Sequence, residues 1–120
     1  MSSSNIVNGV AVVQVANHSR ATGWYAQLLG READLVPMEA VAEWQLADSA
    51  WLQVTTDEDR AGSTTVIIGV KGIHVQRSLS AEAGVAVGDV VEYPGVIRMA
   101  ETLDPDGNTV VFVQDISGHG

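Results

Sequence analysis

The chain has 120 residues, of which 46% are hydrophobic and 18% are charged, and it contains no cysteine. This composition fits one globular domain and excludes a disordered chain, a disulfide-stapled scaffold, a thiolate metal site and a cysteine nucleophile. Six Lys and Arg residues against fifteen Asp and Glu residues give a net charge of −9, which disfavours nucleic acids and anionic membrane surfaces as partners. The start of the chain has no signal-peptide pattern, and no apolar run reaches about 20 residues, so we expect a cytoplasmic protein without a membrane span.

Four apolar runs predict β-strands. Three of them, at 10–15, 65–70 and 109–114, are rich in β-branched residues, and a shorter run covers 51–54. Because both faces of these strands are apolar, both need cover, and helices supply it on one side only. The other side requires a second sheet, a partner subunit or a ligand cavity.

Two segments predict helices. Asn17 is a suitable N-cap, and Gly30 fits the left-handed residue that closes a helix, so we expect a helix over 18–29 with Trp24 and Tyr25 in the core. A weaker second helix is indicated by apolar residues spaced by four, and Gly84 closes it in the same way. The apolar positions are Ala21, Trp24, Tyr25, Leu28 and Leu29 in the first helix and Val75, Leu79 and Ala83 in the second.

The remaining segments predict antiparallel hairpins. One covers 43–54 with a turn at Asp48-Ser49, and the other covers 96–114 with a turn at 104–108, where Pro and Gly residues favour a tight reversal. A polar connector at 56–62 separates the two halves. A strand, a helix and further strands therefore occur twice, which indicates a duplicated module and an α+β fold.

Several short motifs, in their order and spacing, are similar to those of one known family. Val15-Ala16-Asn17 opens the first helix, which continues with Trp24-Tyr25 and Leu28-Leu29-Gly30. The turn Asp104-Pro105-Asp106-Gly107-Asn108 precedes an apolar strand that ends with Gln114. Over about residues 7–116 the chain resembles the vicinal oxygen chelate superfamily, which includes glyoxalase I, extradiol dioxygenases and bleomycin-resistance proteins.

The resemblance implies a single domain, 1–120, built from two βαβββ modules at about 7–58 and 64–116. In this fold the curved sheets surround a cavity and the helices lie outside. Such a cavity would cover the inner faces of the apolar strands.

The resemblance also locates the metal ligands that most enzymes of the superfamily use to polarise a substrate. The corresponding positions are Val10, Thr65, Val111 and a position near Gln53. Of these residues only Gln53 can coordinate, and a lone amide does not hold a divalent ion. We therefore expect neither a metal nor another cofactor.

Other acid–base or metal-binding candidates are few. His18 and His74 lie at the expected helix starts, on the outside of the implied fold, and His119 lies in a Gly-rich tail that we expect to be disordered. Glu43 and Glu101 lie on hairpin strands and are expected to point outward into solvent. The alternative is that one of these carboxylates points inward and acts as a base.

Without a metal, the implied cavity is a small-molecule site, apolar with a few polar groups. We expect a metal-independent binding protein of the glyoxalase/bleomycin-resistance type that sequesters a drug or a metabolite, with a neutral or cationic ligand preferred. Only one of the adjacent Arg98 and Met99 can point inward, and the alternative for Trp44 and Trp51 is packing at a sheet interface. The expected ligand contacts are Val10, Val12, Gln14, Trp44, Trp51, Gln53, Tyr93, Arg98, Met99, Val111 and Val113.

A homodimer is expected, because this family usually completes its cavity across a two-fold axis. Two other functions stay open. The first is a lyase, isomerase or dioxygenase of the same superfamily with a divergent metal or acid–base site. The second is a structural or regulatory module without a small ligand.

Overall fold

The computed structural model describes residues 5–118, so that His119 lies outside the described residues. The elements, in chain order, are β1 (Gly9–Val15), α1 (His18–Leu29), β2 (Leu35–Met38), β3 (Val41–Ala47), β4 (Ala50–Thr56), the short 3-10 helix η1 (Glu58–Arg60), β5 (Thr65–Gly69), α2 (Ile73–Glu82), β6 (Val91–Tyr93), β7 (Ile97–Leu103) and β8 (Thr109–Asp115). Both predicted helices and all the predicted strands are present, whereas β2, β6 and η1 were not predicted. Neither helix among the described residues is long and apolar enough to cross a membrane.

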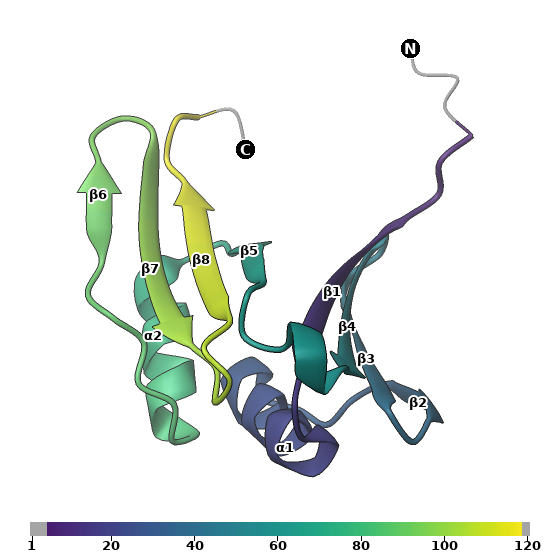
Figure 1. Ribbon diagram of the computed structural model, residues 1–120. Helices are drawn as coiled ribbons and strands as arrows, with labels where there is room; N and C mark the ends of the chain where they lie inside the picture. The colour runs from purple at the N-terminus through teal and green to yellow at the C-terminus, as the bar shows by residue number, and fades with distance from the viewer. Residues whose placement is uncertain (1–4, 119–120) are drawn as a thin grey trace.

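Two four-stranded sheets repeat one topology, with the strand orders β1-β4-β3-β2 and β5-β8-β7-β6. β1 pairs in parallel with β4, and β5 pairs in parallel with β8. The other neighbouring strands are antiparallel. Each half of the chain is therefore a βαβββ module, which confirms the predicted α+β fold. Figure 1 shows the two sheets as separate walls, with β1 and β5 as the strands nearest the middle.

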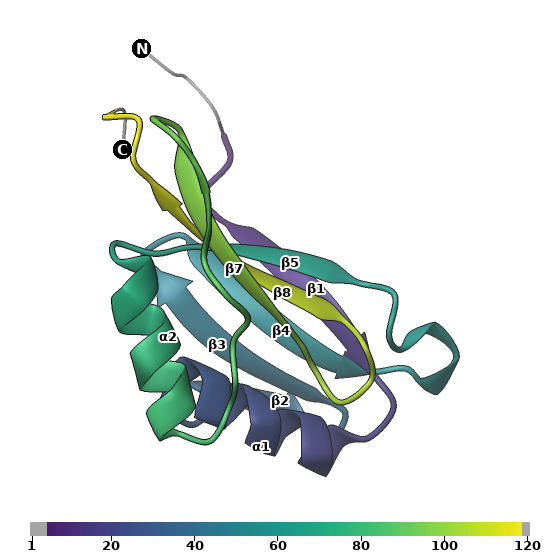
Figure 2. The ribbon, with the colours of Figure 1, turned by 90° about the vertical axis from the view of Figure 1, so that its left-hand side faces the viewer.

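The helices cover one face of each sheet. In Figure 2, α2 lies along one side of the second sheet, and α1 runs below the strands toward α2. The strand residues that face the helices form one continuous core across both modules. This core includes Val13, Val15, Leu52 and Val54 from the first sheet and Val66, Ile68, Val110 and Phe112 from the second.

Helix α1 has the predicted ends. The Asn17 side chain accepts a hydrogen bond of 2.9 Å from the backbone N–H of Arg20, and Gly30 closes the helix in the left-handed conformation (φ 79°). Tyr25 is fully buried, as predicted for the core. Trp24 is only partly buried and packs edge-on against the Tyr25 ring, with ring centroids 4.8 Å apart.

In helix α2, two of the apolar residues from which the helix was predicted are exposed. Val75 is 63% exposed and Leu79 is 55% exposed, whereas Ile73 and Ser80 are buried. The Ser80 hydroxyl donates to the Leu28 carbonyl at the end of α1 (3.3 Å), so a polar contact directs this face inward. At the other end of α2, the Gln114 side chain of β8 accepts a hydrogen bond of 2.9 Å from the Ile73 N–H, which satisfies one of the free donors there.

The turn between β7 and β8 joins the two modules. Asp104, which is 5% exposed, accepts hydrogen bonds from the Tyr25 hydroxyl (2.8 Å) and from the Asn108 side chain (2.8 Å). The Asn108 amide also donates to the Gln14 carbonyl of β1 (2.9 Å). On the surface beside them, Asp106 forms an ion pair of 2.9 Å with Arg20. Residues of the turn thus hold β1 and α1 of the first module.

Gly62, in the connector between the modules, fits closely against this turn. Its backbone is left-handed (φ 92°), and a Cβ atom built on it would collide with the Asp106 backbone oxygen. Both observations require a glycine here. The connector and the turn can approach each other only because position 62 has no side chain.

Candidate ligand-binding site

Each sheet has one face turned away from the helices, which we call its open face. Because side chains alternate along a strand, the open face of the first sheet carries Val10, Val12 and Gln14 on β1. Val13 and Val15 are fully buried, whereas Val10 is 48% exposed and Val12 is 43% exposed. The strand register places Trp51 beside Val10, Gln53 beside Val12 and Thr55 beside Gln14. These five predicted contacts, Val10, Val12, Gln14, Trp51 and Gln53, therefore lie on one surface.

A chain of hydrogen bonds crosses this surface. The Thr55 hydroxyl donates to the Gln53 side-chain oxygen (2.7 Å), and the Gln53 side-chain nitrogen donates to Glu43 Oε2 on the neighbouring strand (2.8 Å). The orientation of the Gln53 amide is therefore fixed at both ends. The expectation that Glu43 points outward is wrong, since it pairs with Gln53 on the open face and is half-buried.

Trp51 is the aromatic residue of this surface. It is half-buried and lies between Val10 on β1 and Gln45 on β3. Trp51 precedes Gln53 by two positions on β4, so both side chains lie on the open face. An aromatic residue, an oriented amide and a carboxylate therefore share this face.

Trp44 lies on the opposite side of the same sheet. It is fully buried, its indole N–H donates to the Arg31 carbonyl (2.9 Å), and its ring packs near Tyr25 with centroids 6.2 Å apart. The expectation that Trp44 contacts the ligand is therefore wrong. Its partner in the register is Leu52, a core residue, so its place on β3 directs it to the helix side.

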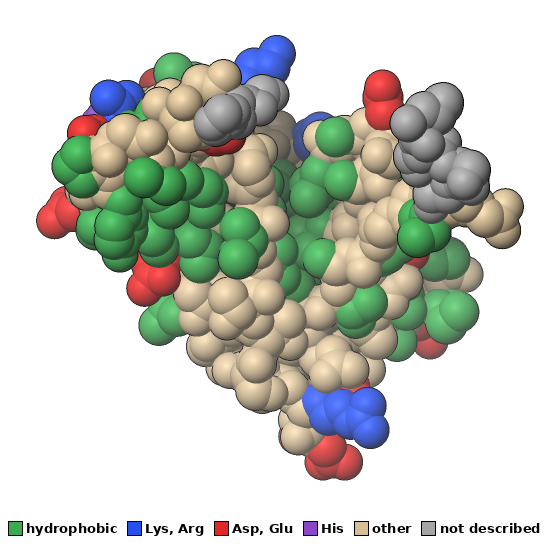
Figure 3. All heavy atoms as spheres, turned by 90° about the horizontal axis from the view of Figure 1, so that it is seen from above, with side chains coloured by type: hydrophobic (Ala, Val, Ile, Leu, Met, Phe, Trp, Pro, Cys, Tyr) green, Lys and Arg blue, Asp and Glu red, His purple; other side chains and the backbone are tan. Residues whose placement is uncertain are grey.

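The open face of the second sheet is largely apolar. Met99 pairs with Val113 on β8 and with Val91 on β6, and Tyr93 pairs with Ile97, so all of them share that face. Val111 lies two residues before Val113, on the same side. Tyr93 and Met99, with Val91 and Glu101, line a surface pocket of about 350 Å³. Figure 3 shows hydrophobic side chains gathered on the lobe of this module, on the left of the view.

Arg98 takes no part in this face. Its neighbour Met99 points to the open side, so Arg98 points to the other, where it forms an ion pair of 2.7 Å with Glu92. The structure thus settles which of the two adjacent residues points inward, and the expectation for Arg98 is wrong. Glu101 pairs with Val111, so it also lies on the open face, where its side chain is exposed.

The open faces carry acidic residues and no basic ones. Glu43, Glu101 and Asp115 occupy open-face positions of the strands. All six Lys and Arg residues lie elsewhere, on helices, in loops or on the helix side, at Arg20, Arg31, Arg60, Lys71, Arg77 and Arg98. A ligand on these faces meets negative charge alone.

The residues at the superfamily's metal-ligand positions do not suit a divalent ion. Val10, Thr65 and Val111 offer at most one hydroxyl, and both ends of the Gln53 amide are engaged by Glu43 and Thr55. Within residues 5–118, no three His, Asp or Glu side chains are grouped so that they could hold a metal. His74 is exposed at the start of α2, and His18, at the start of α1, is half-buried. That the protein binds no metal stays a prediction.

No protein-family model matches this sequence, and no curated protein matches it. Solved structures match well. The chain is 30% identical to a glyoxalase/bleomycin resistance protein from Catenulispora acidiphila, over 90% of this chain and 97% of that one, with a TM-score of 0.85.

Two further structures share the fold at lower identity. TnmS3, an antibiotic binding protein from a Streptomyces species, is 21% identical over 96% of this chain and 98% of its own, with a TM-score of 0.71. A bleomycin-binding protein from Streptomyces verticillus, solved with copper(II)-bleomycin, is 22% identical over 91% of this chain and 96% of its own, with a TM-score of 0.73.

Proposed function

This chain belongs to the glyoxalase/bleomycin resistance protein family of the vicinal oxygen chelate superfamily, and we propose that it binds a small organic molecule on the open faces of its sheets without a metal ion. The observation that carries the proposal is the series of side-chain hydrogen bonds from Thr55 through Gln53 to Glu43, on the same face as Trp51. It supplies oriented polar groups on the same surface as an aromatic residue and the apolar Val10 and Val12, which is the usual composition of a ligand site. The ligand contacts that we retain are Val10, Val12, Gln14, Trp51, Gln53, Tyr93, Met99, Val111 and Val113.

A second copy of the chain completes the site in this proposal. Apolar side chains on the open faces of one chain remain exposed, including Ile67 at 69% and Leu103 at 61%. Exposed apolar patches of this kind mark interaction surfaces. A partner related by a two-fold axis would cover them and give the ligand two walls, one polar around Gln53 and one apolar around Met99.

The charge of the open faces favours a cationic or neutral ligand. A positively charged or hydrogen-bond-donating group would approach Glu43, whose second carboxylate oxygen accepts no hydrogen bond from a described residue. A planar ring would stack on Trp51, and a cationic ring gains further from the face of the indole. The antibiotic-binding and bleomycin-binding proteins of the same fold support sequestration of a drug or metabolite as the use of this site. We propose the cytoplasm as its location.

The direct experiment is native mass spectrometry of the untagged protein as purified, with elemental analysis of the same sample. We expect a mass of twice the 12.6 kDa chain, a substoichiometric metal content, and a retained organic molecule where the ligand survives purification. A monomer at micromolar concentration, or one divalent metal ion per chain that survives dialysis, contradicts the proposal.

Glu43 supports one alternative function. Its inward position and free oxygen make it a candidate proton acceptor for an isomerase or lyase that acts on a C–H bond next to a carbonyl group. Exchange of such a proton with deuterated water, followed by NMR for a panel of small ketones and hydroxyketones, tests this alternative. Exchange that is lost in Glu43→Gln favours the enzyme, and its absence favours a binding protein.

A further inference from the structure

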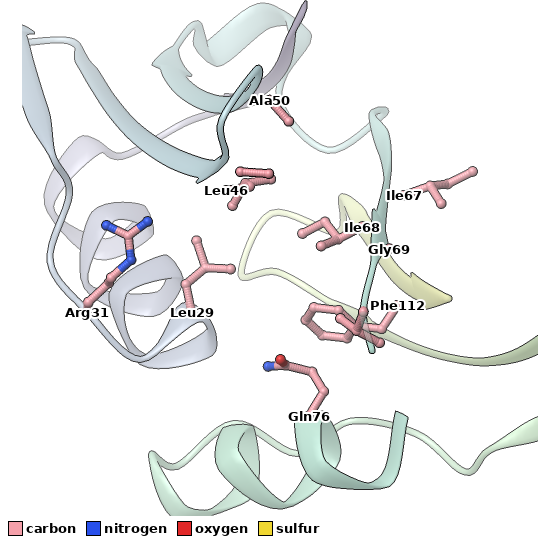
Figure 4. A pocket seen from close by; sticks show the side chains of 11 residues that line it. Leu29, Arg31, Leu46, Ala50, Ile67, Ile68, Gly69, Gln76 and Phe112 are labelled. Atoms are coloured by element: carbon pink, nitrogen blue, oxygen red, sulfur yellow. The ribbon is translucent and has the colours of Figure 1, made fainter. Parts of the chain in front are cut away.

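A second cavity lies on the helix side of the sheets, at the junction of the two modules (Figure 4). Its volume is about 320 Å³. Leu29 at the end of α1 and Leu46 near the end of β3 form one wall, and Ile68, Phe112 and Gln76 of the second module form the other. These strand residues face the helices, so this cavity is on the reverse side of the strands that carry the open faces.

The cavity has the dimensions of a small-molecule site. Its volume is at the lower end of the range of about 300–1,000 Å³ that such sites occupy. In Figure 4 the side chains of Leu29, Leu46, Ile68 and Phe112 converge on the space between the modules, whereas Ile67 points away from it. The converging side chains are therefore apolar, polar groups form about half of the wall surface, and both modules contribute to it.

The charge at the rim is already compensated. Arg31 borders the cavity, but its guanidinium bonds to both carboxylate oxygens of Asp34 (2.7 Å each) and also donates to the Gln45 carbonyl. The same Asp34 carboxylate accepts a hydrogen bond of 2.7 Å from the Gln45 N–H. Since Arg31 is held by these partners, the cavity offers no free charge to an ionic ligand.

Gln76 gives the cavity a hydrogen-bond acceptor. Its amide nitrogen donates to the Ser80 hydroxyl (3.1 Å) and lies 3.5 Å from the Leu28 carbonyl. Because both neighbours hold the nitrogen end, the amide oxygen is left without a partner among the described residues. Figure 4 shows this amide directed toward the space between Leu29 and Phe112.

We propose that this junction cavity is a second binding site, for a neutral and mainly apolar molecule with one hydroxyl donor, such as a phenol. The apolar body lies among Leu29, Leu46, Ile68 and Phe112, and the hydroxyl donates to Gln76 Oε1. Such a ligand touches both modules at once, and it does not depend on the function assigned to the open faces.

The test compares 4-methylphenol with toluene, which has the same ring and methyl group but no donor. Titration of the 15N-labelled protein by NMR should give saturable shifts at Leu29, Leu46, Ile68 and Gln76, with toluene about fivefold weaker, since a neutral hydrogen bond is worth about 1 kcal/mol. In Gln76→Met the two probes should bind equally. In Ala50→Leu, which adds bulk to the lining without removing a contact, both should be lost.

Trp51→Ala is the matched control, because it alters the open face, and it should leave the shifts of Leu29, Leu46, Ile68 and Gln76 unchanged for both probes. Shifts confined to the open faces, or the absence of saturable shifts at the cavity residues from either probe, would overturn the proposal. So would a Gln76→Met variant that still prefers the phenol, or unchanged binding in Ala50→Leu. If Gln76→Met does not fold, Ala50→Leu still decides whether this cavity is the site.

Discussion

The Tyr25 hydroxyl of the first module donates a hydrogen bond of 2.8 Å to the Asp104 carboxylate of the second, and both groups are buried. Asp104 Oδ1 also accepts the backbone N–H groups of Asp106 and Asn108 (2.9 Å each), so the carboxylate is hydrogen-bonded on both oxygens. A buried carboxylate is tolerated only when it is bonded in this way. The turn at 104–108 is therefore a structural link between the modules, through which the position of one open face is fixed relative to the other.

Removing the Tyr25 hydroxyl should weaken this link. Tyr25→Phe leaves the ring in place but takes away one donor to a buried charge, which typically costs about 1–3 kcal/mol. Urea unfolding should show this loss, while Tyr93→Phe, on an exposed residue, should be unchanged within about 0.5 kcal/mol. Equal stabilities for Tyr25→Phe and the wild-type protein would mean that the link contributes nothing.

The same contact predicts a loss of stability at alkaline pH. Burial, followed by the negative charge of Asp104, raises the pKa of Tyr25 well above its usual value of 10.0. The unfolded chain therefore releases the tyrosine proton above about pH 10 while the folded chain keeps it, and the stabilisation is present below that pH and lost above it. Between pH 10 and 11.5 the wild-type free energy of unfolding should fall more steeply than that of Tyr25→Phe, by up to about 1.4 kcal/mol per pH unit. Parallel curves for the two proteins would contradict this assignment.

Gly62 offers a test of how closely the connector packs on the turn. Gly62→Ala places a methyl group against the Asp106 carbonyl and strains a left-handed backbone, so we expect a loss of about 1–3 kcal/mol. Gly23→Ala is the matched control, since a Cβ there meets nothing within 4 Å and Ala favours the helix by about 0.5–1 kcal/mol. Thermal unfolding should move in opposite directions for the two variants. A stabilised Gly62→Ala would show that the close approach does not exist.

The two tryptophans of the first sheet should behave as a core residue and a surface residue. Trp44 is fully buried with its N–H bonded, so Trp44→Ala should cost about 3–5 kcal/mol. Trp51→Ala should cost less, because its side chain is only half-buried in the free chain. Urea unfolding of the two variants under one set of conditions gives the comparison. A Trp51→Ala variant that loses as much stability as Trp44→Ala would make Trp51 a packing residue.

Sequence periodicity predicted which segments form helices and strands better than it predicted which of their side chains face the core. The strands at 10–15 and 109–114 and the helix from His18 to Leu29 were predictable because the capping and turn residues stand beside long apolar runs. The strand Leu35–Met38 was missed because it is short and contains Pro37, and Val91–Tyr93 has only three residues.

The orientation of individual side chains needed the register. Trp44 and Trp51 are similar in sequence context, and only the pairing of Trp44 with Leu52 and of Trp51 with Gln45 separates them. In the same way, the inward position of Glu43 follows from its pairing with Gln53, for which the sequence gives no signal. In helix α2, the face toward the core carries the polar residue Ser80, so the apolar spacing in the sequence indicated the wrong face as buried.

The most direct test of metal-independent binding at Trp51 is calorimetric titration of chelator-treated protein with planar aromatic cations and neutral aromatics, metal-free bleomycin among them. The account predicts saturable binding that added Zn²⁺ or Ni²⁺ does not strengthen, with cations preferred over anionic aromatics of equal size. Trp51→Ala should weaken that binding by about 1–3 kcal/mol, the value of a stacking contact plus lost apolar area. Binding that requires added metal, or equal affinity in the wild-type and Trp51→Ala proteins, would contradict it.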